Sequence, residues 1–477
     1  MGSRKVTSSV SADFQGKHVT VAGLGVSGIP AAKVLHARGA LVTVVNDGDD
    51  ARAREQAAEL EALGVTVRLG DGATLPEGTE LIVTAPGWKP DKPLFTAARE
   101  AGVEVWGDVE LAWRLRGPDA APWLAITGTN GKTTTTQMLA SILKAAGLRT
   151  AAVGNIGVSL LDVVLGEEQY DVLAVELSSY QLHWAPSLRA HSAAVLNLAP
   201  DHLDWHGSME AYARDKGRVY EGNRVACVYN VADKATEDLV READVEEGCR
   251  AIGFTLGSPG PSQLGVVDGI LVDRAFVENR QKNAQELAEV SDVNPPAPHN
   301  IANALAAAAL ARAFGVPAKA VRDGLRAFTP DAHRIAHVAD VDGVAYVDDS
   351  KATNTHAAEA SLAAYESIVW IAGGLAKGAS FDELVAKSAK RLRGVVLIGA
   401  DRALIREALA RHAPEVPVVD LDRTDTGAML QAVTEAKRLA RPGDTVLLAP
   451  ACASMDMFTN YNKRGDAFAE AVRELGS

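Results

Sequence analysis

The chain has 477 residues, of which 47% are hydrophobic and 23% are charged, and its formal net charge is −13. At roughly 150 residues per domain, this length predicts about three domains. The composition is that of a globular protein and excludes disordered, collagen-like and coiled-coil chains as the main class. The negative charge excludes nucleic acid and anionic membranes as partners attracted by the overall field. At face value, it also disfavours phosphorylated ligands.

The three cysteines are Cys227, Cys249 and Cys452. Their odd number and wide spacing indicate neither a disulfide framework nor a zinc ribbon, so we expect a reducing, cytoplasmic environment. No apolar run approaches the ~18–20 residues of a membrane helix. The apolar segment 19–28 follows the basic residue Lys17, as the apolar core of a signal peptide would. Its three glycines favour a strand-to-helix turn instead.

Residues 1–118 alternate short β-branched runs with helical stretches. This alternation predicts a parallel sheet wrapped by helices, and we interpret the segment as a Rossmann-like domain. The expected strands are 19–22, 41–45, 65–69, 81–84 and 103–106, and the expected helices are 30–38, 51–63 and 94–101.

Two further α/β domains are predicted, a central one at 119–330 that resembles P-loop ATPases and a Rossmann-like one at 331–477. The polar stretch 278–292 is expected to be a loop or insertion, because it ends in paired prolines. The expected central strands are 123–127, 172–175, 193–196 and 225–229, with helices at 132–146 and 300–314; the C-terminal strands are 344–347, 368–371, 395–398, 416–419 and 445–448.

A glycine motif, Gly23, Gly25 and Gly28, lies between the first expected strand and helix. Such glycines let the backbone turn tightly and approach a pyrophosphate at a helix N-terminus. Asp47 lies at the end of the second strand, where a dinucleotide fold places its ribose-binding acid. Alone, this pattern is typical of a nicotinamide-dependent oxidoreductase, although the glycines could also serve only helix–strand packing.

A second glycine motif, residues 127–133, resembles a P-loop. Its backbone N–H groups would cradle phosphates, Lys132 would reach the β/γ-phosphates and Thr133 would hold Mg²⁺. The usual first glycine position is occupied by Ile126. The motif predicts ATP binding, either in an enzyme that consumes ATP or in a regulator that only binds it.

Acidic and histidine side chains follow in the same domain. Glu176 ends an expected strand, where a carboxylate beside a P-loop can bind metal, or merely cap a helix. Asp201, His202, Asp204 and His206 resemble a metal site. Leu203 occupies the position of the zinc-protease glutamate, and the nearby ATP cradle favours Mg²⁺ over zinc. The alternative for His206 is an ordinary loop histidine whose hydrogen bonds are satisfied. Lys216 reads as part of a solvated helix face.

The C-terminal domain carries polar motifs directly after apolar strands. These are 333–334, 348–354, 373–377 and 451–461. Since open α/β sheets bind ligands at the carboxyl edge of their strands, a lysine and a serine from two such motifs could grip a small dicarboxylate. Ordinary loop polarity is the alternative for each motif taken separately.

Over residues 19–464 the chain resembles the Mur ligases, the ATP-dependent amino-acid-adding enzymes of peptidoglycan synthesis. Residues 127–133 match that family's variant of the P-loop, which it shares with folylpolyglutamate synthetases. Residues 349–354 and 450–454 resemble the family's D-glutamate-adding branch. The resemblance implies a monomeric ligase that uses three small-molecule substrates, UDP-N-acetylmuramoyl-L-alanine, ATP and D-glutamate. The nearest alternative is a sibling that adds another amino acid.

The resemblance also implies site residues. UDP-substrate contacts are expected from Gly23, Leu24, Val26, Ser27, Asp47, Gly48, Gly87, Asn155 and His202. ATP contacts are expected from Gly128, Thr129, Asn130, Gly131, Lys132, Thr133, Thr134, Asn300, Asn303, Arg334 and Asp349. D-Glutamate contacts are expected from Lys351, Thr353, Lys377, Ser454, Met455 and Tyr461, the last of which stands where relatives often have Phe.

The resemblance assigns metal binding to Thr133, Glu176, His202 and Lys216, and catalysis to Lys132, Lys216, His202 and Arg334. In this family the lysine that matches Lys216 carries a carbamate, which turns an ammonium into an anionic Mg²⁺ ligand. Residues gathered from three domains imply closure around ATP, with residues 329–331 as the expected hinge.

Overall fold

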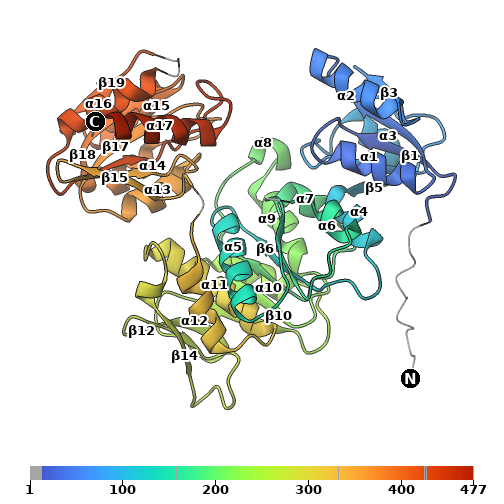
Figure 1. Cartoon of the computed structure of the whole chain (residues 1–477), viewed down its shortest axis with the longest axis horizontal. Coiled ribbons are helices and arrows are strands. Elements are labelled where there is room, and N and C mark those ends of the chain that lie inside the picture. Colours follow the sequence, from blue (N-terminus) through green and yellow to red (C-terminus); the bar gives the residue numbers. More distant parts are fainter. Residues whose placement is uncertain (1–12, 157, 331, 424, 426, 476–477) are drawn as a thin grey trace. The chain divides into compact units, whose positions relative to one another are not determined.

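The computed structural model describes residues 13–156, 158–330, 332–423, 425 and 427–475 (Figure 1). These residues divide into two compact units. The first comprises the described chain up to Val293 together with Ile301–Phe328, and the second comprises Asn294–Asn300 and the described chain from Thr329 onward. Asp331, within the expected hinge, lies outside the described residues.

The first sheet of the first unit is parallel, with strand order β3-β2-β1-β4-β5. Val21, Val44 and Val83 face one hydrophobic cluster, while Ala22, Val45 and Ile82 face the other, so helices cover both faces. This is the Rossmann-like arrangement expected from the sequence. The strands are β1 (His18–Ala22), β2 (Leu41–Asn46), β3 (Thr66–Leu69), β4 (Leu81–Thr84) and β5 (Glu104–Gly107), and the helices are α1 (Gly28–Ala37), α2 (Ala51–Glu61), α3 (Pro93–Glu100) and α4 (Asp108–Leu115).

The second sheet of this unit joins nine of the described strands in the order β14-β13-β12-β11-β10-β9-β6-β8-β7. Strands β6 to β12 run parallel, and the hairpins β12–β13 and β13–β14 are antiparallel. The strands are β6 (Trp123–Thr127), β7 (Ala152–Gly154), β8 (Leu173–Glu176), β9 (Ser192–Val195), β10 (Ala226–Asn230), β11 (Arg250–Phe254), β12 (Gln263–Val267), β13 (Ile270–Asp273) and β14 (Gln285–Glu289).

Helices cover this sheet on both faces, and the Ala-rich α11 packs into the core through Ala304 to Ala311. The helices are α5 (Lys132–Ala145), α6 (Leu160–Leu165), α7 (Ser179–His183), α8 (Leu203–His206), α9 (Met209–Gly217), α10 (Lys234–Glu242), α11 (Pro298–Ala313) and α12 (Ala318–Ala327), with short 3₁₀ turns at Arg218–Tyr220 and Val290–Asp292.

The expectation that 278–292 is a loop or insertion was wrong for its second half. That half forms β14 and a 3₁₀ turn, and β14 pairs with β13 at the edge of the sheet. Leu287 and Ala288 are buried in the core, whereas the flanking Glu286 and Glu289 are exposed. Charged residues on an edge strand hide the apolar signal because only part of the strand faces the core.

The second unit contains a six-stranded sheet in the order β15-β16-β20-β17-β18-β19, in which only β15 is antiparallel among the described strands. Its strands are β15 (Ala336–Val341), β16 (Val344–Asp348), β17 (Ile368–Gly373), β18 (Leu392–Ile398), β19 (Val418–Asp420) and β20 (Thr445–Leu448). Its helices are α13 (Thr355–Ala363), α14 (Asp382–Ser388), α15 (Arg402–His412), α16 (Ala428–Leu439) and α17 (Tyr461–Leu475), with a 3₁₀ turn at Ala389–Arg391.

None of the described helices combines the length and the apolar character needed to cross a membrane.

Candidate active site

The first glycine loop connects β1 to α1. Gly23 has a φ of 106°, and a Cβ at Gly28 would lie 1.9 Å from the Gly23 carbonyl oxygen, so both positions need glycine for the turn itself. A Cβ at Gly25 would meet nothing within 4 Å, so packing does not explain that glycine. The Leu24 N–H donates to Asn46 Oδ1 at 3.1 Å, and the Val26 side chain is 91% exposed.

Asp47 and the turn at residues 85–88 lie at the same edge of the first sheet. Asp47 pairs with Lys92 at 2.5 Å, and a Cβ on Gly23 would lie 2.9 Å from Trp88 Nε1. The Gly48 carbonyl accepts a hydrogen bond from Asn46 Nδ2 at 2.9 Å. The expected UDP-substrate residues of this domain therefore converge on the carboxyl edge of β1 and β2, where open α/β sheets bind ligands.

The P-loop connects β6 to α5. Gly131 has a φ of 83° and directly precedes α5, and a Cβ there would lie 2.4 Å from Asn303 Oδ1 on α11. Lys132 Nζ donates to the Gly128 and Thr129 carbonyls, each at 2.9 Å. Thr133 and Thr134 are buried in the first turn of α5. The loop and the helix N-terminus thus have the strand–loop–helix geometry of the phosphate cradle that the sequence predicts.

Two side chains that the sequence did not single out hold this cradle in shape. The Asn130 N–H donates to Asn197 Oδ1 at 2.8 Å, and the Thr129 and Tyr212 hydroxyls lie 3.0 Å apart. Asn197 follows the apolar strand β9, so its place at the carboxyl edge could have been inferred from that strand. Tyr212 lies on α9, and no local pattern indicates its role.

Glu176 ends β8 beside the cradle and is buried. Its Oε1 accepts a hydrogen bond from Asn155 Nδ2 at 2.9 Å. Its Oε2 has no hydrogen-bond partner among the described residues. A buried carboxylate oxygen without a donor is costly, and a bound cation would offset that cost.

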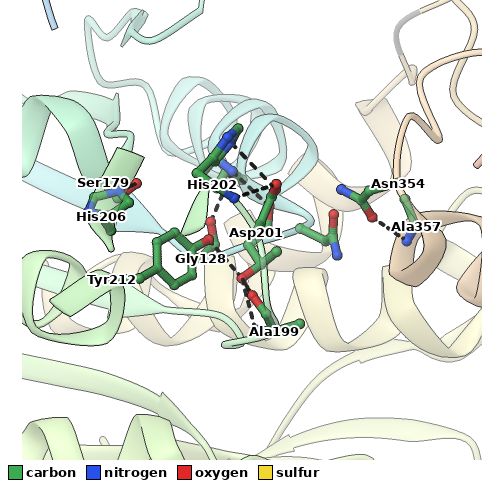
Figure 2. Close-up of polar contacts among 12 residues, drawn as sticks. Gly128, Ser179, Ala199, Asp201, His202, His206, Tyr212, Asn354 and Ala357 are labelled. Atoms are coloured by element: carbon green, nitrogen blue, oxygen red, sulfur yellow. Dashed lines mark hydrogen bonds and ion pairs between the residues drawn. The ribbon is translucent and has the colours of Figure 1, made fainter. Parts of the chain in front are cut away.

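Lys216 is the largest departure from the sequence interpretation. It lies on α9 and is only 2% exposed, so its expected place on a solvated face was wrong. Its Nζ donates to the Gly128 carbonyl at 2.8 Å, and Figure 2 shows that carbonyl beside Tyr212. Burial, together with the positive charge of Lys132, holds the pKa of Lys216 well below its usual value. The site therefore contains an amine that ionises with difficulty.

The two histidines of the 201–206 segment differ in their surroundings (Figure 2). His206 Nδ1 lies 3.0 Å from Asp215 Oδ2, and its Nε2 lies 3.0 Å from the Ser179 hydroxyl, so both ring nitrogens have protein partners. His202 is more exposed than His206, and its Nε2 lies 3.5 Å from Asp201 Oδ2. The buried part of the His202 side chain lowers its pKa. Among the described residues, no group of three or more His, Cys, Asp or Glu side chains could hold a metal alone.

In the second unit, Asp349 directly follows β16 and is buried. The Ile335 N–H donates to its Oδ1 at 3.2 Å, and the Ser361 hydroxyl donates to its Oδ2. Burial raises the pKa of Asp349 to about 6, although these donors and the charge of Arg334 oppose the shift. Asn300, in the other segment of this unit, is buried and donates to the Pro295 carbonyl at 3.3 Å.

The expected D-glutamate residues lie in the same unit. Lys351 Nζ donates to the Tyr461 hydroxyl at 2.9 Å, so the hydroxyl at position 461 holds the lysine. The Thr353 N–H donates to the Lys351 carbonyl at 2.8 Å, and Ser454 is buried. Lys377 and Met455 are exposed.

Comparison with known proteins identifies the family. Family models match a Mur ligase MurD-like N-terminal domain at residues 17–107, the Mur ligase middle domain at 126–311 and a Mur ligase glutamate ligase domain at 333–452. The UDP-N-acetylmuramoylalanine--D-glutamate ligase of Streptomyces coelicolor is 90% identical over 98% of this chain and 99% of its own length. The protein of that name from Thermobifida fusca is 60% identical over 97% of this chain and 99% of its own length.

Solved structures agree in fold. The UDP-N-acetylmuramate-alanine ligase MurC of Thermotoga maritima has a TM-score of 0.56 at 17% identity, over 96% of this chain and 99% of that one. MurF of Acinetobacter baumannii has a TM-score of 0.56 at 17% identity, over 90% of both chains. The predicted series of α/β folds is confirmed, and the chain belongs to the Mur ligase family.

Proposed function

We propose that this chain is an ATP-dependent ligase that joins D-glutamate to UDP-N-acetylmuramoyl-L-alanine in the synthesis of peptidoglycan precursors. The relatives of that name, 90% and 60% identical over nearly the whole chain, support this substrate choice. The observation that carries the chemistry is the cradle itself, in which a P-loop lysine, an unpartnered buried carboxylate oxygen and a buried amine lie together.

The UDP-substrate binds at the edge of the first sheet. Gly23, Leu24, Val26 and Ser27 contact the diphosphate, and Asp47, Gly48 and Gly87 lie beside the uridine. The approach of a phosphate explains why residue 25 is glycine although no protein atom requires it. Asn155 and His202, from the second sheet, contact the muramoyl part.

ATP binds at the P-loop. The backbone of residues 128–131 and the first turn of α5, with Thr133 and Thr134, cradle its phosphates, and Lys132 neutralises the β/γ-oxygens. Asn303 lies against the loop, because a Cβ at Gly131 would come within 2.4 Å of the Asn303 Oδ1 atom. From the family resemblance, we assign Asn300, Arg334 and Asp349 to contacts with adenine, ribose and γ-phosphate.

The cradle fits a magnesium ion. Oxygen ligands suit Mg²⁺, and the Thr133 hydroxyl and the unpartnered Glu176 Oε2 would supply two of them, with the His202 imidazole as a nitrogen ligand. Lys216 completes this set as a carbamate. A neutral amine attacks CO₂, a new N–C bond forms and one proton is released, and burial keeps Lys216 in the neutral form that this requires. Bound Mg²⁺ supplies positive charge that stabilises the transferring phosphoryl group.

The reaction forms an amide through an acyl phosphate. The L-alanyl carboxylate attacks the γ-phosphorus and ADP leaves. The D-glutamate amine then attacks the acyl carbon, and the amide forms as phosphate leaves and the amine loses a proton. Lys132 and Arg334 stabilise the phosphoryl oxygens. The D-glutamate pocket is lined by Lys351, Thr353, Lys377, Ser454, Met455 and Tyr461, and its lysines pair with the carboxylates.

ADP release tests this proposal. We expect ADP only when ATP, UDP-N-acetylmuramoyl-L-alanine and D-glutamate are all present, and omission of any one should reduce the rate to background. ADP release independent of the amino acid would refute the proposal. As part of it, we propose a cytoplasmic monomer with domains at 1–118, 119–330 and 331–477, and light scattering tests the monomer.

A further inference from the structure

A buried carboxylate, Asp215 on α9, joins three helices of the first unit. It is 4% exposed and directly precedes Lys216. Its Oδ2 atom lies 2.9 Å from His183 Nδ1 and 3.0 Å from His206 Nδ1. His183 is the last residue of α7 and His206 is the last residue of α8. One oxygen atom therefore holds the ends of both helices against the helix that carries Lys216.

An arginine completes the surroundings of this carboxylate. Arg218 Nε lies 3.3 Å from Asp215 Oδ1, and Arg218 Nη1 donates to the His183 carbonyl at 2.9 Å. Because a guanidinium stays charged in proteins, Asp215 has a permanent cationic partner. An ionised carboxylate can only accept hydrogen bonds, so both histidines donate to it through Nδ1.

The second ring nitrogen of His206 extends the connection. In a neutral imidazole whose Nδ1 donates to Asp215, Nε2 can only accept, and it lies 3.0 Å from the Ser179 hydroxyl (Figure 2). The Ser179 hydroxyl therefore donates to His206. Serine, histidine and aspartate in this order activate a nucleophile in hydrolases. Here Ser179 is only 2% exposed and the His206 side chain is 0% exposed, so a substrate cannot reach them and the bonds serve to fix positions.

The joined helices carry three of the four proposed magnesium ligands. Glu176 lies three residues before Ser179, the first residue of α7, and His202 directly precedes α8. Lys216 follows Asp215 on α9. Since Mg²⁺ demands near-ideal octahedral geometry at about 2.0–2.1 Å, the separations among these ligands must be held closely. Groups that orient metal ligands typically contribute about 10–100-fold to metal affinity or activity.

We propose that Asp215 is a positioning residue that holds Glu176, His202 and Lys216 in the arrangement that magnesium binding requires. Asp215 does not contact the ion, because both of its carboxylate oxygens already have protein partners. The proposal rests on the magnesium cradle of the function proposed above.

The matched pair Asp215→Asn and Asp444→Asn tests this. Asp444 is also 4% exposed and pairs with an arginine, Arg393, at 3.1 Å. It directly precedes β20 in the second unit, where none of the proposed metal ligands lies. Mn²⁺ suits the same oxygen ligands and is the probe, and electron paramagnetic resonance without nucleotide measures its Kd. We expect Asp215→Asn to weaken Mn²⁺ binding by about 10–100-fold and Asp444→Asn to leave it within about twofold.

A second pair of variants leaves Asp215 in place. In His206→Asn, the amide nitrogen takes the approximate place of Nδ1 and keeps the bond to Asp215. In His206→Gln, it takes the approximate place of Nε2 and loses that bond. We expect His206→Gln to bind Mn²⁺ at least about threefold more weakly than His206→Asn. Thermal melting shows which variants are folded, and this pair decides if Asp215→Asn does not fold.

Unchanged Mn²⁺ binding in folded Asp215→Asn, equal losses in Asp215→Asn and Asp444→Asn, or binding in His206→Gln as tight as in His206→Asn would each overturn the positioning role. A wild-type protein that binds no Mn²⁺ would refute the magnesium cradle and this role together. Mn²⁺ binding by the wild type without any ADP release that depends on D-glutamate would instead refute the proposed reaction alone. The failures are therefore distinguishable.

Discussion

Lys216 makes the sharpest prediction, because a lysine in an ordinary environment could not do what we propose. A lysine with a pKa of about 10.4 is only about 0.1% neutral at pH 7.4, and each unit by which burial lowers its pKa raises that fraction about tenfold. Lys216 is 2% exposed, and burial is the largest cause of its lowered pKa. The neutral amine that CO₂ needs is thus available at neutral pH.

The perturbation is Lys216→Met, which removes the amine and keeps most of the buried side-chain volume. Volume-conserving core changes cost less than about 1.5 kcal/mol, so the variant should fold. The loss of one hydrogen bond to Gly128, at 2.8 Å, adds about 1 kcal/mol. Turnover should nevertheless fall at least about 100-fold, as when one preorganised charge is removed from an active site.

ADP release measured with and without dissolved CO₂ provides the assay, and ¹³C-labelled bicarbonate should give a carbamate NMR signal in the wild type only. Lys216→Ala leaves a cavity, so formate or acetate should partly restore its activity. Lys234→Ala, at an exposed lysine on α10, is the control and should be fully active. Full activity of Lys216→Met, with no dependence on CO₂ in the wild type, would refute the reasoning.

Three further changes test other parts of the site. Lys132→Ala should abolish turnover while calorimetry still detects binding of the UDP-substrate, and near-normal turnover would remove the cradle assignment. Gly131→Ala should lower both the melting temperature and ATP affinity more than Gly147→Ala does, because φ is similar (83° and 80°) but only the first Cβ collides, at 2.4 Å from Asn303 Oδ1; equal effects would contradict the steric argument. Asp349 has a folded pKa of about 6, above its ordinary ~3.9, so the folded state binds more protons between these values and stability falls as pH rises through them. In denaturant titrations, the free energy of unfolding of the wild type, relative to that of Asp349→Asn, should fall by up to about 3 kcal/mol between pH 4 and pH 7. If the difference in unfolding free energy between the two proteins stays constant over this range, the carboxyl is not protonated on folding.

Much of the fold could be predicted because the parallel strands are buried on both faces and read as short apolar runs. The strand expected at 123–127 has the bounds of β6, and glycine or proline punctuation flanks it. Strand β15 escaped prediction because none of its residues is fully buried and a register shift between His337 and Ala339 interrupts the alternation of exposed and half-buried positions. Tertiary pairing, which no local pattern reports, decides such edge strands.

The site residues also include some that the sequence could predict and some that it could not. Gly131, Lys132 and Glu176 could be located because they follow strands at the carboxyl edge of a parallel sheet. Lys216 could not be recognised from residue pattern, since its partner is a backbone carbonyl 88 residues earlier in the chain.

One measurement tests the central claim most directly, a scan of ADP release with ATP and UDP-N-acetylmuramoyl-L-alanine across D- and L-glutamate, L-alanine, glycine and diaminopimelate. We predict ADP release with D-glutamate and rates at background with the others, because we propose that Lys351, Tyr461 and Ser454 line a pocket for a dicarboxylate. A preference for another amino acid, or ADP release without any, would contradict the account.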